Sequence, residues 1–260
     1  MIHVGRRSYP YMEEVNEGLV RELQRASPTT AARGRILDVG CGRGQLGEVA
    51  RALGWEVWGV ESSDEACDAA ERRLDRVIRA DLNDHDGVRR ATGGTSFDGL
   101  VFSDVLEHLY DPRTVLERYL ELAKPDAYVF VSVPNAVAWT NRLQWALGNV
   151  RYDDTGIMDR THVRFFTFAT AKELVEASGC TVERVSSTPY LARAVLPAVK
   201  GLVKGRRSAA PDPRAIVDST AYRAYMRFLY PMERAVAAVW PELLAFRIIV
   251  VGRKGAGRSA

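Results

Sequence analysis

Residues 36–44 read ILDVGCGRG, an apolar run that leads directly into a turn with glycine at every second position. The apolar run predicts a buried strand. The glycines allow positive φ angles and a close approach of the backbone to a ligand. In an open parallel sheet, ligands bind beyond the carboxyl ends of the strands, where the strand order switches. The turn is therefore the expected cofactor site of an α/β fold.

Short apolar runs alternate with helical patterns along much of the chain. Strands of a parallel sheet that is covered by helices on both sides are apolar on both faces, as these runs are. Thr170 and Glu173 predict a capping box for the last helix of the series, and Gly179 predicts its end. We expect strands at 35–40, 56–61, 76–81, 98–103, 128–133, 181–187 and 246–253, and helices at 45–53, 64–73, 112–123 and 170–178.

At 260 residues the chain suits one sizeable α/β domain with an appendage. The segment between the last two strands begins as a linker and then becomes helical. It could pack on the domain or serve as a lid, a dimer face or a membrane-surface helix. The expected parts are an N-terminal helical segment (1–30), a core (31–188 plus 246–253), a helical insert or lid (189–245) and a disordered tail (254–260).

Charge and cysteine content exclude several classes of protein. The net charge of +3 is too small to indicate a nucleic-acid partner, and no RNA-binding module is visible. Cys41, Cys67 and Cys180 are widely spaced and unpaired, which favours a reducing compartment over a disulfide framework. No export signal is visible at the N-terminus, and no apolar run approaches the ~18 residues of a spanning helix. We therefore expect a cytoplasmic protein without a transmembrane segment.

Positive charge is concentrated at the start of the insert. Lys200, Lys204, Arg206 and Arg207 fall within one short stretch. A solvated linker is the simpler interpretation. Attraction to anionic lipid or to a phosphate-bearing substrate is the alternative.

The acid ahead of the glycines separates two kinds of cofactor. Gly42, Gly44 and Gly47 satisfy GxGxxG, which by itself is a weak indication of a dinucleotide. Asp38, however, would bring negative charge toward a bound pyrophosphate, and Cys41 lies inside the turn. An acid at this position suits a ligand with a cationic amine and no phosphate, such as S-adenosylmethionine.

The run LDVGCGRGQLG resembles the first motif of the class I S-adenosylmethionine-dependent methyltransferases. Their fold is a Rossmann-like, seven-stranded, mostly parallel sheet with helices on both faces. The resemblance implies that Glu61 binds both ribose hydroxyls, since a carboxylate can accept two hydrogen bonds, and that Asp81 reads the adenine amino group. The implied cofactor-binding residues are Asp38, Gly40, Cys41, Gly42, Gln45, Leu46, Glu61, Ser62, Asp81, Leu82 and Ser103.

Acidic and imidazole side chains follow the fourth predicted strand. Asp104, Glu107 and His108 share one side of a helical turn by their spacing, and His162 lies in the later segment MDRTHVRFFT. These four residues can form a mixed nitrogen and oxygen site for Mg²⁺ or Mn²⁺, which would help an acceptor hydroxyl to lose its proton. Asp104, His108 and His162 are thus candidate catalytic residues. A metal-free general base at His162, or a structural role for the group, remains open.

The motif is similar to the ExxEH motif of ubiquinone-pathway O-methyltransferases and of small-RNA terminal 2′-O-methyltransferases, with Asp104 in place of the first glutamate. The segments VPNAVAWTNRLQWALG and GIMDRTHVRFFT look like bacterial glycan methyltransferases. Aromatic and forked donor groups in them suit a sugar, and the candidate substrate residues are Asn135, Trp139, Arg160 and Arg164.

These resemblances lead us to expect an O-methyltransferase of polysaccharide biosynthesis, acting on a sugar or glycan that can carry a lipid or phosphate. Peripheral membrane contact and a homodimer are compatible with this hypothesis, and nucleic acid is not an expected partner. The alternatives are a catechol or quinone acceptor, and a non-catalytic cofactor-binding regulator.

Overall fold

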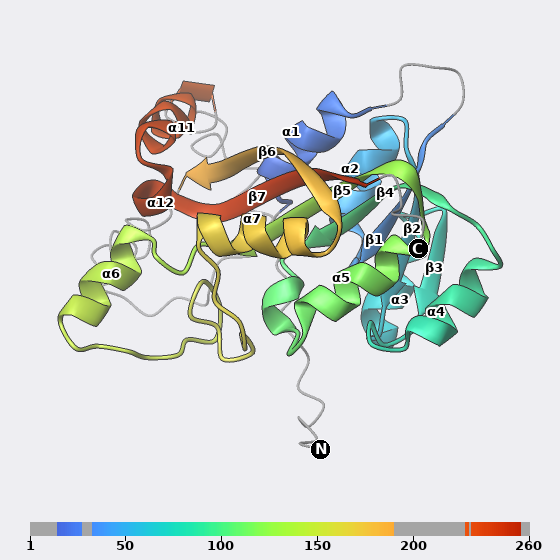
Figure 1. Cartoon of the computed structure of the whole chain (residues 1–260), viewed down its shortest axis with the longest axis horizontal. Helices are drawn as coiled ribbons and strands as arrows, with labels where there is room; N and C mark the ends of the chain where they lie inside the picture. The colour runs from blue at the N-terminus through green and yellow to red at the C-terminus, as the bar shows by residue number, and fades with distance from the viewer. Residues whose placement is uncertain (1–14, 28–32, 190–226, 229, 256–260) are drawn as a thin grey trace, which may run out of the picture.

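The computed structural model describes residues 15–27, 33–189, 227–228 and 230–255 (Figure 1). Its centre is one seven-stranded sheet in the order β3-β2-β1-β4-β5-β7-β6. Strands β1 to β5 pair in parallel, and β7 runs antiparallel to both of its neighbours. The strands are β1 (Arg35–Val39), β2 (Glu56–Glu61), β3 (Arg76–Arg79), β4 (Phe97–Ser103), β5 (Ala123–Pro134), β6 (Cys180–Pro189) and β7 (Ala245–Lys254).

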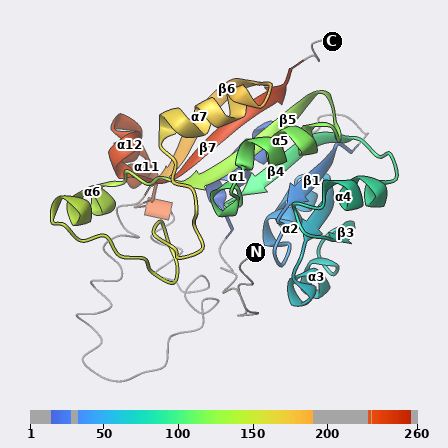
Figure 2. The ribbon, with the colours of Figure 1, turned by 60° about the horizontal axis from the view of Figure 1, so that its bottom comes forward.

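Helices cover both faces of the sheet (Figure 2). One buried cluster joins one face to α1, α2 and the end of α3, and a second cluster joins the other face to α4, α5 and α7. The helical elements are α1 (Glu17–Arg25), α2 (Gln45–Ala52), α3 (Asp64–Ala70), α4 (His85–Thr92), η1 (Leu106–His108), α5 (Pro112–Leu120), α6 (Trp139–Ala146), α7 (Phe168–Ala177), α11 (Tyr230–Val239) and α12 (Pro241–Leu244).

The central strands are apolar at successive positions because both of their faces are buried. In β4, Leu100 and Phe102 belong to the cluster under α5, whereas Val101 belongs to the cluster under α1 and α2. Neighbouring side chains on a strand point to opposite faces. The pattern read from the sequence as a covered parallel sheet is therefore confirmed, as is the seven-stranded α/β fold.

Several local boundaries differ from the expectation. Helices α3 and α5 end three residues early, β5 begins at Ala123, and α6 was not expected as a helix. The capping box predicted at Thr170 and Glu173 is wrong, because Thr167 is the extended N-cap residue and exchanges hydrogen bonds with Thr170. Helix α4 was not expected at all, although Asp84 caps it by accepting a hydrogen bond from the amide of Gly87. Gly179 follows α7 with a φ of +91°, as its position predicted.

The expected parts of the chain are described to different extents. Helix α1 lies in the N-terminal segment, and α11 and α12 lie in the insert. The basic stretch from Lys200 to Arg207 lies outside the described residues, as does most of the expected tail. In the described parts of the chain, every helix is too short or too polar to cross a membrane.

Helix α1 is fixed to the sheet by polar contacts at both ends. The buried carboxylate of Glu22 accepts hydrogen bonds from Arg184 (2.7 Å) and Ser186 (3.2 Å) of β6. At the other end, Asn16 Nδ2 donates to Ser132 Oγ of β5 over 2.9 Å. These contacts bring the start of α1 next to the carboxyl end of β5.

A glycine in β2 makes room for the glycine-rich turn after β1. A Cβ atom added at Gly59 would lie 2.5 Å from Cys41 Sγ and 2.7 Å from Leu74 Cδ1. Cys41 is buried in the turn, so any larger residue at position 59 must displace it. The position of the turn therefore depends on the absence of a side chain in the neighbouring strand.

We expect Gly59→Ala to lower the free energy of unfolding by about 1–3 kcal/mol, because it over-packs a filled core. Urea denaturation measures the change. Gly99→Ala in β4 is the matched control. Its added Cβ would lie 3.2 Å from the nearest atom, Ile36 Cγ2, so a smaller shift of that side chain relieves the contact. Equal stabilities of the two variants would contradict the packing described for Cys41.

Candidate active site

A cavity of about 440 Å³ lies beyond the carboxyl ends of β1, β2 and β4. It is located where the strand order reverses, at the neighbouring strands β1 and β4. Of the predicted cofactor residues, Asp81 does not line it; its exposed carboxylate accepts hydrogen bonds from the backbone and side chain of Asn83 instead. The predicted residues that do line it are Asp38, Gly40, Cys41, Gly42, Gln45, Leu46, Glu61, Ser62, Leu82 and Ser103.

Asp38 presents a buried carboxylate to this cavity. The residue is 2% exposed, and its Oδ1 has no hydrogen-bond partner among the described residues. Burial, and to a lesser extent the negative charge of Glu61, raises the pKa of Asp38 to about 7. Nearby, a Cβ at Gly40 would lie 2.7 Å from Val105 Cγ2. An unsatisfied acceptor beside a glycine turn fits the cationic amine of an amino-acid-like ligand.

Glu61, at the end of β2, is already held by backbone groups. Its Oε1 accepts hydrogen bonds from the amides of Ser62 (2.8 Å) and Ser63 (2.9 Å), and Oε2 accepts one from Gly42 (3.1 Å). These bonds tie the end of β2 to the glycine turn of β1. The hydroxyl of Ser62 also donates to Oε1 over 3.4 Å, so a diol bound here would share or replace donors that are already present.

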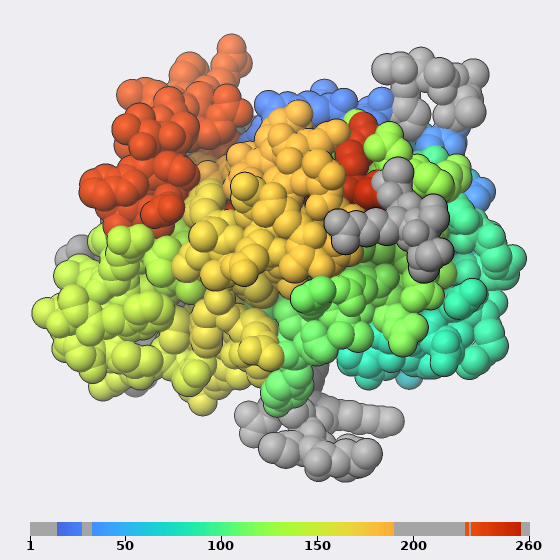
Figure 3. All heavy atoms as spheres, viewed as in Figure 1, coloured from blue at the N-terminus to red at the C-terminus, as the bar shows by residue number. Residues whose placement is uncertain are grey.

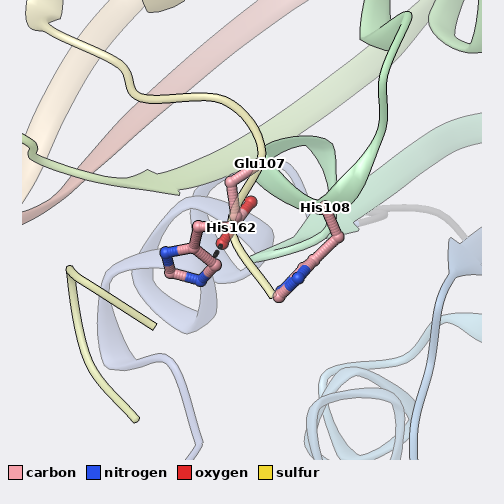
Figure 4. A group of neighbouring side chains, drawn as sticks. All are labelled: Glu107, His108 and His162. Carbon is pink, nitrogen blue, oxygen red and sulfur yellow. Dashed lines mark ion pairs between the residues drawn. The ribbon is translucent and has the colours of Figure 1, made fainter. Parts of the chain in front are cut away.

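Glu107, His108 and His162 form a compact group on the other side of the cavity (Figure 4). Their potential ligand atoms lie within 4.8 Å of one another. Glu107 is 1% exposed, and neither carboxylate oxygen has a hydrogen-bond partner among the described residues. His162 Nε2 lies 4.0 Å from Glu107 Oε1. Burial raises the pKa of Glu107 well above its usual range, and the charge of Asp104 adds to the effect.

Hydrogen bonds define which nitrogen of each histidine carries the proton. His162 Nδ1 lies 2.9 Å from the carbonyl of Ile157, so it must donate. Thr161 Oγ1 donates to Asp159 and therefore accepts from His108 Nδ1, 3.1 Å away. In the neutral form of each ring the proton is thus on Nδ1, and Nε2 carries the lone pair that a metal would use. Burial, aided by His162, lowers the pKa of His108.

The structure does not place Asp104 in this group, contrary to the expectation from its spacing. The helical turn covers only Leu106–His108, and Asp104 has a φ of +54°, so the residue does not share the helical face. Its Oδ2 accepts a hydrogen bond from Arg247 Nε (2.8 Å), and Oδ1 accepts one from Ser132 Oγ (3.1 Å). Asp104 therefore forms an ion pair with Arg247 in the cavity wall. The structure does not support the prediction that it is a metal ligand.

The structure also does not bring the predicted substrate residues to the cavity. Asn135 is fully buried and donates to the backbone carbonyls of Glu242 in α12 and Ala245, the first residue of β7. Arg160 pairs with Asp154 on the surface, and Arg164 donates to the carbonyl of Tyr110. None of the four predicted substrate residues lines the cavity. They are Asn135, Trp139, Arg160 and Arg164.

Several cavity residues were missed in the sequence. Asn16 is signalled only as the cap of α1, where its Oδ1 accepts from the amide of Leu19. Asp159 and Thr161 flank the predicted Arg160 in the same short loop. Arg247 has no local signal, because it reaches Asp104 only after β7 has paired with β5.

The buried carboxylate of Asp38 predicts a pH-dependent affinity for a cationic ligand. With a pKa of about 7, it is mostly protonated at pH 6 and ionised at pH 8. We expect the ammonium group of S-adenosylhomocysteine to bind the ionised form, so its affinity should rise about tenfold between these pH values. Isothermal titration calorimetry at each pH measures the change.

Asp38→Asn is the control, since the amide has the same shape and no charge to titrate. We expect weak binding by this variant with little change between pH 6 and pH 8. An unchanged affinity of the unaltered protein over the same range would remove Asp38 from the ligand contacts.

Comparison with known proteins identifies the family. The Methyltransferase domain family matches residues 11–185. The ubiquinone biosynthesis O-methyltransferase of Thiobacillus denitrificans is 31% identical over 184 residues, which are 69% of this chain and 77% of that protein. The mitochondrial counterpart from Bos taurus is 29% identical over 68% of this chain and 49% of its own length. The chain thus spans about half the length of several curated relatives that it matches.

Solved structures agree on the fold. A SAM-dependent methyltransferase from Archaeoglobus fulgidus aligns with a TM-score of 0.55 at 18% identity, covering 92% of this chain and 94% of the other. The [4+2]-cyclase SpnF aligns with a TM-score of 0.53 at 17% identity, covering 93% and 81%. A cyclase among the neighbours shows that this fold alone does not determine the reaction. The family match and the cofactor cavity together show that the chain belongs to the class I S-adenosylmethionine-dependent methyltransferases.

Proposed function

We propose that this protein transfers a methyl group from S-adenosylmethionine to a hydroxyl oxygen of a catechol- or quinone-type small molecule. The observation that carries the proposal is the buried Glu107 beside two histidines at the cavity, whose carboxylate accepts no hydrogen bond from the described residues and lies 4.0 Å from His162 Nε2. The relatives named for ubiquinone biosynthesis support an aromatic acceptor. A cavity of about 440 Å³ suits a small molecule.

Asp38 and Glu61 hold and orient the cofactor in this proposal. S-adenosylmethionine supplies a methyl group that is already activated by its sulfonium charge. The protein therefore has mainly to align the acceptor oxygen and to assist its deprotonation. Asp38 would pair with the amine and Glu61 with the ribose diol, leaving the side of Glu107 and the histidines to the acceptor.

Glu107, His108 and His162 are the proposed ligands of a divalent cation. Two orphaned carboxylate oxygens and two imidazoles with unprotonated Nε2 atoms make a donor set that suits a metal. Imidazole favours Mn²⁺, Zn²⁺ or similar ions over Mg²⁺, which prefers oxygen ligands. A cation here would lower the pKa of a bound hydroxyl group.

A sugar or glycan acceptor has less support than the sequence suggested. Its physical basis was a pocket formed by Asn135, Trp139, Arg160 and Arg164, and none of these residues lines the cavity. The named relatives also favour an aromatic hydroxyl. Catechol hydroxyls are more acidic than those of sugars, so the catalytic demand on the protein is smaller.

The acceptor class can be tested with two probes. The purified chain, S-adenosylmethionine and Mn²⁺ or Zn²⁺ are incubated with 3,4-dihydroxybenzoate or with methyl glucoside, and products are identified by mass spectrometry. We expect a singly methylated catechol and no methylated glycoside. Methylation of the glycoside alone would overturn the proposed acceptor, and no product from either probe would favour a non-catalytic cofactor-binding protein.

Removal of the metal ligand should separate catalysis from cofactor binding. We expect Glu107→Gln to lower turnover at least about 100-fold and to abolish the bound metal, since loss even of groups that only orient metal ligands costs 10–100-fold. Metal content by mass spectrometry and affinity for S-adenosylhomocysteine are measured together. The affinity should stay within about twofold, because Asp38 and Glu61 are unchanged.

Glu117→Gln is the matched control, because Glu117 of α5 pairs with Arg113 on the surface. It should keep both metal and turnover. Chelator treatment followed by metal add-back should abolish and restore the activity of the unaltered protein. Full activity of a metal-free sample would contradict the role of a cation and leave His162 as the candidate general base.

A further inference from the structure

Arg247 is the single arginine or lysine among the described residues that line the cavity. It lies near the start of β7, a strand that Figure 3 shows largely covered by α7 and β6. Its side chain is 12% exposed, and its Nε donates to Asp104 Oδ2 over 2.8 Å. The two terminal nitrogens of the guanidinium make no hydrogen bond to the described residues. A guanidinium that is mostly buried and uses one of its three nitrogens keeps donors for a ligand.

A chain of hydrogen bonds connects Arg247 to the start of α1. Asn16 Oδ1 accepts from the amide of Leu19, so Asn16 Nδ2 is the atom that donates to Ser132 Oγ, 2.9 Å away. The amide of Asp104 also donates to Ser132 Oγ, over 3.1 Å. Because both lone pairs of the Ser132 hydroxyl are occupied, it donates its proton to Asp104 Oδ1. Both carboxylate oxygens of Asp104 therefore accept, one from Ser132 and one from Arg247.

The middle of this chain is buried and holds a residue in an uncommon conformation. Ser132 is fully buried, and Asn16 is 4% exposed. Asp104 has a φ of +54°, a value that few residues other than glycine adopt. Its amide is held there by the carbonyl and the hydroxyl of Ser132, each 3.1 Å away. The direction of the carboxylate that binds Arg247 thus depends on Ser132.

We propose that Arg247 binds an oxygen atom of the methyl acceptor. Asn16, Ser132 and Asp104 are then positioning residues, because they fix the direction in which the guanidinium points. The inference rests on the proposed function, which supplies an acceptor with two neighbouring oxygen atoms. One oxygen lies beside Glu107 and the other at Arg247, so the guanidinium determines which hydroxyl receives the methyl group.

The position of Arg247 favours the acceptor over the cofactor as its ligand. Asp38 and Glu61, the acids that suit the cofactor, belong to β1 and β2, whereas β4 and β5 separate β7 from β1 in the sheet. Burial raises the pKa of Glu107, and the charge of Arg247 partly opposes that rise, so Arg247 acts on the acceptor side. The guanidinium carbon also lies 4.8 Å from the ring centroid of Phe246, which lines the cavity too. An aromatic ring next to a forked donor suits a flat, oxygenated molecule.

Calorimetric titration tests the inference without turnover. The probe is 3,4-dihydroxybenzoate, added to the full chain with bound S-adenosylhomocysteine and Mn²⁺. We expect Arg247→Gln to weaken binding of this catechol at least about tenfold, the effect of losing a hydrogen bond to a charged group. Arg247→Lys should recover part of the loss, because it restores the charge without the planar fork. Affinity for S-adenosylhomocysteine should stay within about twofold in both variants, which shows that the fold is intact.

Asn16→Ser tests the far end of the hydrogen-bond chain. Serine is as good a helix N-cap as asparagine, so α1 keeps its cap while Ser132 loses its amide donor. We expect the catechol affinity to fall about fivefold, the effect of one buried hydrogen bond. The ratio of the 3-O-methyl to the 4-O-methyl product with S-adenosylmethionine, measured by chromatography and mass spectrometry, should shift toward the minor isomer. A loss of general stability would not change this ratio.

Arg253→Gln is the matched control, because Arg253 lies in the same strand and pairs with Glu183 and Asp126 away from the cavity. It should bind the catechol like the unaltered protein. Undiminished binding by Arg247→Gln would overturn the inference, as would an unaltered protein that does not bind the catechol. An equal loss of S-adenosylhomocysteine affinity in Arg247→Gln would assign the guanidinium to the cofactor and also overturn it. Catechol binding that depends on Arg247 but yields no methylated product would support this inference and contradict the proposed methyl transfer.

Discussion

The strand order reverses between β1 and β4, and each part of the candidate site depends on that reversal. Strand β1 is followed by α2 on one face of the sheet, and β4 is followed by η1 and by α5 on the other. The two chain segments diverge from adjacent strands and leave a space between them. Asp38 enters this space from the first turn, and Glu107 and His108 enter it from the second. Without the reversal, the segments after β1 and β4 would lie on the same face of the sheet and leave no space between them.

Five carboxylates reach this space, and they differ in how their charge is compensated. Asp159 accepts hydrogen bonds from the amide and the hydroxyl of Thr161. Glu61 is held by three backbone amides, and Asp104 is paired with Arg247. Asp38 and Glu107 are buried, have a raised pKa and keep oxygen atoms without a hydrogen-bond partner among the described residues. Buried acceptors are rarely left unsatisfied in a native protein. The two buried acids therefore mark the two positions of the cavity where a ligand is most strongly favoured.

Local patterns in the sequence were sufficient for the parts of the site that lie at strand ends. Asp38 and Glu61 each follow an apolar run, and the sheet brings the ends of such runs together. Glu107 and His108 were also visible, since they come directly after β4. The role of Asp104 was not predictable in this way. Its partner Arg247 is 143 positions away in the sequence and becomes a neighbour only in the folded sheet.

Polar residues in the aromatic segment were misleading for a similar reason. Asn135 follows β5 as a ligand-binding residue often does, but its amide is needed to satisfy backbone carbonyls in α12 and at the start of β7. A side chain that supports the backbone and one that contacts a ligand look alike in a sequence. Only the position of β7 distinguishes them. The family likeness likewise pointed to methyl transfer while leaving the acceptor to be inferred from the cavity.

The cavity is lined by residues from two parts of the chain, one inside the family match and one in β7 beyond it. The family match ends at residue 185, whereas Phe246 and Arg247 enter the cavity from the antiparallel strand beyond it. Because β7 runs opposite to its neighbours, its first residues lie where the parallel strands end. The glycine turn and Glu61 thus lie within the segment that the family matches, and the guanidinium that pairs with Asp104 lies beyond it. A substitution in that late strand therefore changes the Arg247 side of the cavity and leaves the hydrogen bonds between the glycine turn and Glu61 in place.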